Sequence, residues 1–243
     1  MPSEQRLQEI REAITQCQRC PLAKGRLNAV PGEGPAKVDI MFIGEAPGFH
    51  ENKQGKPFVG QAGQFLDELI QAAGVDREQV YITNVVKCRP PNNRDPLPEE
   101  LEACQVYLDE QIELLQPEVI VTLGRISMAK YVTGGRISAI HGRTHNVNGQ
   151  KVVTMYHPAA ALHQPALRPV LLEDFSRMKK FISSSETPAV AEEGKNPPSV
   201  NSIAEVIPLP QSPEEQPGEY PAEESLQSEE IEEQTPPEQL SLF

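Results

Sequence analysis

Four short apolar runs constrain the fold of this chain more than any other feature. They are Val38–Gly44, Val80–Val86, Val119–Gly124 and Lys151–Tyr156. The first three are almost continuous in aliphatic and β-branched residues, which is typical of strands that are buried on both faces. We therefore expect four strands inside a layered domain.

Helix-like segments separate and follow these runs. Within Ala62–Ala73, apolar residues recur at three- and four-residue spacing, and Gly74 follows as a stop. Pro98–Leu115 opens with Pro-Glu-Glu, which favours a helix start, and a further helix is expected at about Pro169–Ile182. Strands that alternate with helices predict an α/β fold, in which a parallel sheet is covered by helices on both faces. Ligands of such sheets bind beyond the carboxyl ends of the strands.

The acidic charge of the chain is concentrated at its C-terminal end. The formal net charge is -13, and residues 183–243 hold 14 Glu, 10 of the 24 prolines and one basic residue, Lys195. Such a composition offers too little apolar surface to offset the entropy of ordering, so it predicts a disordered tail. Residues 1–182 carry equal numbers of acidic and basic groups and are long enough for one domain with a core.

Composition also excludes several classes of protein. Four cysteines are too few for a disulfide scaffold, and no apolar run is long enough to span a membrane. The N-terminal residues are polar and lack the pattern of a secretory signal. We therefore expect a cytoplasmic, nucleoid-associated monomer with reduced thiols.

The cysteines form one close pair, Cys17 and Cys20, followed by Cys88 and Cys104. Four reduced thiols without a ligand would be the simplest interpretation. However, the two-residue spacing lets the first pair reach one metal centre, and all four cysteines lie in segments that can meet at one edge of the sheet. This pattern predicts a four-cysteine metal site and leaves zinc and iron–sulfur both open.

Polar and glycine-rich motifs follow the expected strands. Glu45-Ala46-Pro47-Gly48 and Glu51 follow the first strand, and Phe58 sits in the next loop between Pro57 and Gly60. Asn84 ends the second strand and His157 follows the fourth. An amide on a fixed strand suits the reading of a base edge, but it could equally satisfy a neighbouring loop. Phe58 could be a core residue, and His157 could be a hydrogen-bonded bystander.

Together these motifs resemble those of the family 4 uracil-DNA glycosylases. The resemblance rests on GEAPG at 44–48, GKPFVGQAG at 55–63, TNVVKCRPPNNR at 83–94, HPAA at 157–160, and the order and spacing of the cysteines. It covers roughly residues 10–182. It implies a three-layer α/β/α sandwich around a four-stranded parallel sheet, a [4Fe–4S] cluster on the four cysteines, and hydrolysis of the N-glycosidic bond of uracil in DNA, single- or double-stranded.

The resemblance also implies roles for individual residues. Phe58 would stack on a flipped uracil and Asn84 would read its edge. His157 and the backbone near Glu45 and Ala46 would stabilise charge on the O2 side of the base. Glu45 is the expected water-positioning or cation-stabilising carboxylate. Glu51 is the second candidate, and it could instead exclude the methyl group of thymine.

One position departs from the better-known family 1 enzymes, which carry an Asp where this chain has Ala46, so the water-activating group stays open. The neutral charge of the body is also unlike that of a typical DNA-binding protein. Basic residues near the motifs could grip phosphates locally, namely Lys87, Arg89, Arg94, Arg136, Arg143 and Arg168. Leu162 is a candidate wedge for the gap that a flipped base leaves, or else a core leucine.

The last five residues form the only apolar cluster in the final part of the tail. They are Gln239, Leu240, Ser241, Leu242 and Phe243, and they resemble the peptide with which bacterial repair proteins bind the sliding clamp. A short match of this kind also arises by chance. One alternative to the enzyme is a catalytically silent iron–sulfur or zinc DNA-binding module, which would be expected to have lost Phe58, Asn84 or His157. The other is a clamp adaptor, whose tail recruits partners while the body only docks.

Overall fold

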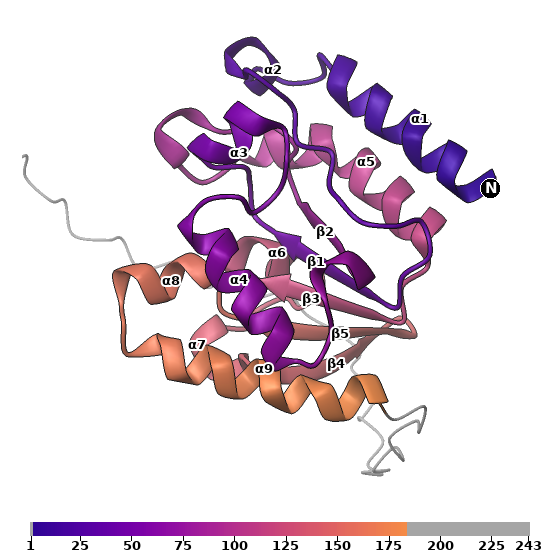
Figure 1. Cartoon of the computed structure of the whole chain (residues 1–243). Helices are drawn as coiled ribbons and strands as arrows, with labels where there is room; N and C mark the ends of the chain where they lie inside the picture. Colours follow the sequence, from indigo (N-terminus) through magenta and orange to yellow (C-terminus); the bar gives the residue numbers. More distant parts are fainter. Residues whose placement is uncertain (1, 184–243) are drawn as a thin grey trace, which may run out of the picture. The chain divides into compact units, whose positions relative to one another are not determined.

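The computed structural model describes residues 2–183, which are built around a five-stranded sheet (Figure 1). Its strands are β1 (Ile40–Gly44), β2 (Tyr81–Asn84), β3 (Val119–Leu123), β4 (Arg143–Val147) and β5 (Gln150–Met155). Their spatial order is β2-β1-β3-β5-β4, and all neighbours are parallel except β4 and β5. The α/β class and the four predicted parallel strands are confirmed, and β4 is a fifth strand that the sequence analysis did not predict.

Strand β4 pairs with β5 through a tight hairpin. Its turn residues Asn148 and Gly149 both have positive φ, 51° and 87°, as the two-residue turn that matches the twist of paired strands requires. The strand is polar and largely exposed, so it contains no apolar run. The signal for it lay in the Asn-Gly dipeptide rather than in hydrophobicity.

Nine α-helices and two short 3₁₀ helices are described within residues 2–183. They are α1 (Pro2–Gln16), α2 (Leu22–Gly25), α3 (Phe49–Gln54), α4 (Gln61–Ala72), η1 (Arg77–Gln79), η2 (Pro91–Asn93), α5 (Pro98–Leu115), α6 (Arg125–Ala129), α7 (Ile137–Ile140), α8 (Pro158–His163) and α9 (Leu167–Ser183). The three helices predicted from the sequence correspond to α4, α5 and α9. None of the helices in this part of the chain is long and apolar enough to cross a membrane.

The helices form two layers, one on each face of the sheet (Figure 1). Successive side chains of a strand point to opposite faces. Phe42 of β1 therefore packs with α4 and α9, where its ring stacks on Phe175 at 6.0 Å between centroids. Its neighbour Met41 packs with Leu7 of α1 and Leu108 of α5. All five residues of β1 are buried, which explains why that run is continuously apolar.

Helix α9 ends at Ser183, next to the predicted start of the tail. The remaining tail residues, including the motif at 239–243, lie outside the described residues. The domain boundary and the clamp motif therefore stay predictions.

Candidate active site and cysteine cavity

A cavity of about 550 Å³ lies beyond the carboxyl ends of the parallel strands. All six residues that the sequence analysis assigned to uracil binding or catalysis line it, namely Glu45, Ala46, Glu51, Phe58, Asn84 and His157. They come from four separate segments. The topology thus brings together residues that lie more than 110 positions apart in the sequence.

Asn84 is the last residue of β2 and is 1% exposed. Among the described residues, its side-chain oxygen Oδ1 has no hydrogen-bond partner. A buried acceptor without a partner costs about 1–3 kcal/mol. The side chain is therefore ready for a ligand that donates a hydrogen bond, and it does not satisfy a neighbouring loop through this atom.

Phe58 lines the cavity and also belongs to the core on the α4 and α9 face. Its φ is 50°, in the left-handed region, which costs an L-residue roughly 1–2 kcal/mol. Its ring stacks on that of His157, with 5.6 Å between the centroids. A Cβ at Gly44 would lie 2.7 Å from the Phe58 ring, so only glycine at the end of β1 leaves room for it.

The Glu51 carboxylate holds the loops that border the cavity. It accepts hydrogen bonds from the backbone N–H groups of Gly48 at 3.1 Å, Val59 at 2.8 Å and Gly60 at 3.0 Å. Both of its oxygens are thus used, and they join the loop after β1 to the segment that carries Phe58. The catalytic role predicted for Glu51 is untested, but these contacts give it a definite structural one.

His157 precedes α8 and caps its start. The backbone N–H of Ala159 donates to His157 Nδ1 at 3.1 Å, so the ring proton of the neutral form lies on Nε2. Burial lowers the pKa of His157 to about 4, although the nearby Glu51 carboxylate opposes this shift. Near neutral pH the residue is therefore a neutral imidazole with one N–H to donate.

Glu45 follows β1 directly and is half-buried. Burial raises the pKa of this carboxyl group, the charge of Asp95 raises it further, and the charge of Arg125 lowers it. Asp95 and Arg125 form an ion pair with each other. A carboxylate with a raised pKa binds protons more readily, which suits a group that orients or deprotonates water.

The predicted DNA contacts fall into two groups. Leu162 and Arg94 line the cavity, whereas Arg89, Arg143 and Arg168 do not. Leu162 is 42% exposed, so it is not a core leucine. Arg94 forms two hydrogen bonds with the buried carboxylate of Glu100, at 2.8 and 2.7 Å.

Of the other three arginines, two have described side-chain partners. Arg89 lies over the ring of Phe49 at 5.4 Å and donates to Asn93. Arg168 pairs with Glu68 and lies 4.2 Å from the ring centroid of Phe65. Arg143 is exposed on β4, where it is in register with Thr154 of β5.

The prediction that Lys87 belongs to a basic patch for DNA phosphates is wrong. Its side chain is fully buried, and Nζ donates to Thr83 Oγ1, to the Asn84 carbonyl and to Gln111 Oε1 at 2.7 to 2.8 Å. Burial lowers the pKa of Lys87 to about 7. The residue supports the end of β2 from inside and is not available to a phosphate.

Several residues that line the cavity were not predicted. They are His50, Gln61, Asn93 and His163. Asn93 lay within a quoted motif and could have been singled out as a polar loop residue. Gln61 also lay within a quoted motif, whereas His50 and His163 lie in the short helices α3 and α8, and only the three-dimensional structure places these two at the cavity.

The four cysteines line a second cavity, together with Ile14, Leu22 and Tyr107. Three sulfurs accept N–H groups: Cys17 from Arg19 at 3.4 Å, Cys88 from the Arg26 guanidinium at 3.2 Å, and Cys104 from Lys87 at 3.3 Å. Among the described residues, no three His, Cys, Asp or Glu side chains are grouped so that they could hold a metal ion.

Burial also determines the protonation of these thiols. It raises the pKa of Cys104 to about 11 and raises that of Cys88 as well. Protonated thiols bind metal poorly, so a metal would have to displace their protons. The donor set of four thiols in one cavity with N–H groups directed at the sulfurs fits a metal–sulfur group chemically.

Comparison with known proteins shows which family this chain resembles. The sequence model described as "Uracil DNA glycosylase superfamily" matches residues 31–180. A type-4 uracil-DNA glycosylase of Saccharolobus solfataricus is 50% identical, over 72% of this chain and 86% of the relative. The protein of the same name from Thermotoga maritima is 44% identical, over 74% of this chain and 96% of the relative. The chain belongs to the type-4 uracil-DNA glycosylase family.

A third type-4 uracil-DNA glycosylase, from Sulfurisphaera tokodaii, is 47% identical over 72% of this chain and 84% of the relative. Membership of the type-4 family confirms the resemblance drawn from the sequence motifs. The match over residues 31–180 includes the cavity residues and the cysteines at positions 88 and 104. It ends before the C-terminal motif, which the comparison therefore does not test.

Proposed function

We propose that the protein is a DNA-repair hydrolase that removes uracil from DNA by breaking its N-glycosidic bond. The observation that carries the proposal is the cavity at the sheet edge, where a buried amide with an unpaired oxygen, an aromatic ring and a neutral histidine meet. Type-4 uracil-DNA glycosylases with 44–50% identity support the same function.

The substrate base has to leave the double helix before it can enter this cavity. A flipped base is generally held by stacking and by hydrogen bonds to its pairing edge. Phe58 supplies the stacking ring. Asn84 Oδ1 accepts the N3–H of uracil, and its amide N–H₂ donates to O4. Cytosine presents an acceptor at N3 and a donor at position 4, so it would leave Asn84 with two mismatched contacts.

Bond cleavage moves an electron pair from the C1′–N1 bond onto uracil, where charge accumulates at O2. A fixed donor at that oxygen lowers the barrier. His157 provides it as the neutral Nε2–H tautomer, and a backbone N–H near Ala46 supplies a second donor. A neutral donor suits this step because it need not lose its proton to the base.

Water then adds to C1′ of the sugar and gives up a proton. Glu45 is the carboxylate that we assign to this step, either orienting the water or stabilising the positive charge on the sugar. Its raised pKa makes it a better proton acceptor than an exposed glutamate. Glu51 stabilises the loops around it.

We further propose that Cys17, Cys20, Cys88 and Cys104 hold a [4Fe–4S] cluster. Support for this assignment comes from the order and spacing of the four cysteines, which resemble the cluster ligands of the type-4 family, and from their position around one cavity. When bound, such a cluster links the segments after α1 and after β2 to α5. Iron and sulfide analysis of protein purified without air tests this, and stoichiometric zinc without iron would contradict it.

The C-terminal residues 239–243 are proposed to bind a bacterial sliding clamp. The excess of acidic residues before them suits a tether role, because like charges repel one another. Binding would raise the local concentration of the enzyme at newly replicated DNA. Replacing Leu242 and Phe243 by Ala should abolish clamp binding in a titration. Unaltered binding of this variant would contradict the proposal.

The decisive test of the enzymatic function is a gel assay with a labelled oligonucleotide that contains one uracil. Alkali should cleave the strand at the uracil position after incubation with the protein, in both single-stranded and duplex DNA. The matched oligonucleotide with thymine should stay intact. If uracil DNA is bound but never cleaved, the catalytically silent DNA-binding alternative is correct.

A further inference from the structure

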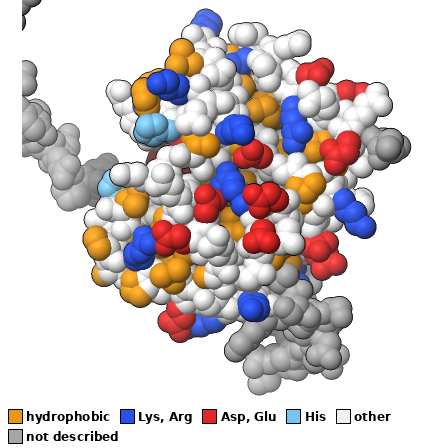
Figure 2. All heavy atoms as spheres, in the orientation of Figure 1, with side chains coloured by type: hydrophobic (Ala, Val, Ile, Leu, Met, Phe, Trp, Pro, Cys, Tyr) orange, Lys and Arg blue, Asp and Glu red, His pale blue; other side chains and the backbone are white. Residues whose placement is uncertain are grey.

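A second cleft, of about 590 Å³, lies behind the segment that carries Phe58, and Phe58 lines it too. Acidic and basic side chains gather near the centre of the face shown in Figure 2. The charged side chains that line the cleft include those of Glu33, Lys56, Asp67 and Arg77. The proposed mechanism uses none of these four residues.

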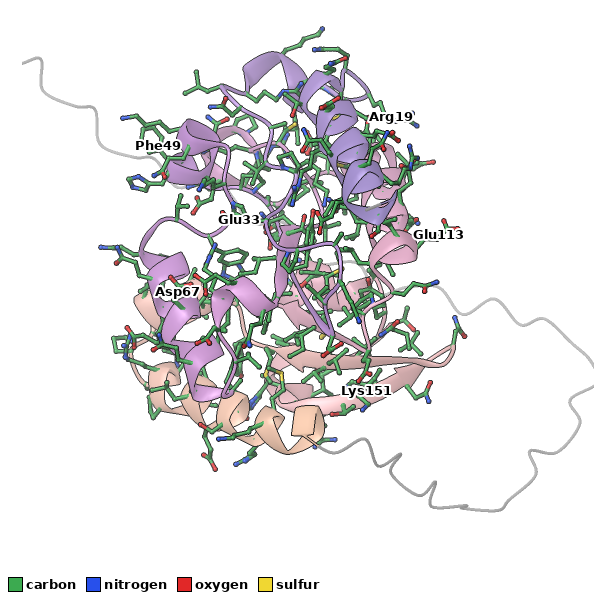
Figure 3. The ribbon with its side chains drawn as sticks, turned by 45° about the vertical axis from the view of Figure 1, so that its right-hand side comes forward. Arg19, Glu33, Phe49, Asp67, Glu113 and Lys151 are labelled. Atoms are coloured by element: carbon green, nitrogen blue, oxygen red, sulfur yellow. The ribbon has the colours of Figure 1, made fainter. Side chains whose placement is uncertain are left out.

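Arg77 is the residue around which this charged group is arranged. Its Nη2 donates to the backbone carbonyl of Pro57 at 2.7 Å, and its Nη1 donates to Asp67 Oδ1 at 2.7 Å. Glu33 lies 3.5 Å from Nη2. Figure 3 labels Glu33 and Asp67, which come from the loop before β1 and from α4.

The carbonyl that Arg77 contacts belongs to the residue directly before Phe58. Phe58 has φ 50°, a conformation that persists only where the surroundings enforce it. On the other side of Phe58, Glu51 holds the N–H groups of Val59 and Gly60. The strained residue is therefore held from both directions by charge-assisted hydrogen bonds.

The anchors on the Arg77 side are parts of regular elements. Arg77 begins η1, four residues before β2 starts, and Asp67 lies in the middle of α4. The Arg77 side chain is 23% exposed, so solvent screens it less than a fully exposed ion pair. A guanidinium can bind the carbonyl and the carboxylate at once because its donors are fixed in a planar fork.

We propose that Arg77 is a positioning residue for uracil recognition. It acts through the Pro57 carbonyl and sets the orientation of the Phe58 ring on which the base stacks. This inference rests on the proposed uracil-excision function, and it adds a residue outside the cavity to the determinants of base binding. A plain surface ion pair would contribute only a little to stability and nothing to base binding.

The test compares Arg77→Gln with the wild-type holoenzyme on uracil DNA and on free uracil as an inhibitor. Stacking acts on bound substrate and on the product base alike, so KM and the inhibition constant of uracil should both rise about tenfold. The kcat should stay within about twofold. Arg77→Lys keeps the charge and one donor, so it should restore part of the loss.

A double-mutant cycle with Phe58→Ala separates positioning from a general structural effect. If Arg77 acts through the ring, Arg77→Gln should change KM less than about twofold in the Phe58→Ala background. A full tenfold effect there would overturn the proposal. If Arg77→Gln does not fold, Asp67→Asn replaces it, since it removes the partner that orients Arg77, and a smaller shift in the same direction is expected.

Arg6→Gln serves as the matched control, because Arg6, like Arg77, pairs with two carboxylates, those of Glu9 at 3.0 Å and Glu110 at 3.3 Å, on α1 and α5. It should leave KM and uracil inhibition unchanged. A wild-type protein that neither cleaves uracil DNA nor binds uracil would overturn the proposed function itself. An active wild type with an unaltered Arg77→Gln variant would overturn only the role of Arg77.

Discussion

The cavity at the carboxyl ends of the strands and the cysteine cavity differ in the state of their polar groups. The first, the cavity proposed to bind uracil and called the uracil cavity below, is lined by two carboxylates and contains a buried acceptor without a described partner. The cysteine cavity is lined by four thiols, apolar residues and three basic residues, and three of its sulfurs already accept N–H groups. The first is suited to a ligand that enters and leaves, and the second to a group that stays.

The two cavities nevertheless share one short segment of chain. Asn84 ends β2 and faces the uracil cavity, whereas Cys88 lies four residues later and faces the other. Lys87 lies between them with its side chain buried against the Asn84 carbonyl. We therefore expect chemistry to depend on the first cavity and stability on the second, and the following predictions test that division.

Asn84→Ala should have the largest effect on excision. It removes both edge contacts to uracil, so the single-turnover rate should fall by about 10³-fold. Affinity for undamaged duplex should change little, because contacts with phosphates do not involve this residue. The melting temperature should hold, since the variant also removes a buried unpaired oxygen. Near-normal excision in a rapid-quench assay would remove Asn84 from the site.

His157→Ala should lower the single-turnover rate by about 10²-fold, the scale expected for one lost donor at developing charge. KM should change less than kcat, because the donor is needed most in the transition state. His157→Gln can supply one N–H and should recover part of the rate. If KM rose as much as the affinity for uracil fell, and kcat did not change, the residue would only bind the base.

Cys104→Ala should affect stability more than chemistry. We expect loss of visible absorbance and of bound iron, together with a fall in melting temperature of about 5–10 °C, since 1 kcal/mol corresponds to about 2–4 °C in a chain of this size. The excision rate per folded molecule should change less than about fivefold. A 10³-fold loss in fully folded protein would show that the two cavities are not separable.

A change of pH between 5.5 and 8 should alter the excision activity less than any of these substitutions does. The pKa of His157 is about 4 in the folded protein, so this residue stays neutral and no loss of activity near pH 6.5 should come from it. The unfolded chain takes up this proton below about pH 6.5. Stability should therefore decline as the pH falls from about 6.5 to 4 and level off below that. An activity step near pH 6.5 that His157→Gln abolishes would contradict this assignment.

Removal of residues 239–243 should have no effect on excision from short oligonucleotides. The residues assigned to base recognition all lie between positions 45 and 157, and a short oligonucleotide offers no clamp. Kinetics of the full-length and truncated proteins should agree within about twofold. A larger loss would mean that the tail takes part in catalysis rather than in recruitment.

Much of the sheet and of the uracil cavity could be predicted from the sequence. The buried parallel strands appear as apolar runs, and the residues directly after them must meet at one edge of the sheet. For this reason Glu45, Asn84 and His157 were found without a structure. The sequence did not distinguish a core position from a cavity position for Phe58, because its left-handed backbone and its place between core and cavity have no simple sequence signature.

What could not be predicted depended on burial and on pairing. Lys87 looked like a DNA contact because charge was counted without knowing that the end of β2 encloses it. The bond from Arg77 to the Pro57 carbonyl joins residues 20 positions apart and leaves no periodic pattern. The polar strand β4 lacks an apolar run altogether, and its partner β5 alone does not reveal it.

The hairpin at Asn148 and Gly149 has a consequence for the solubility of the protein. Without β4, strand β5 would be the edge of the sheet, and its buried Val152 and Val153 would present unpaired backbone groups beside apolar side chains. Edges of that kind pair with other chains and promote aggregation. Strand β4 instead presents Arg143, Thr144 and Asn146 outward, and these exposed polar residues are poor partners for a second sheet. The short turn thus places a polar strand, in place of an apolar one, at this edge of the sheet.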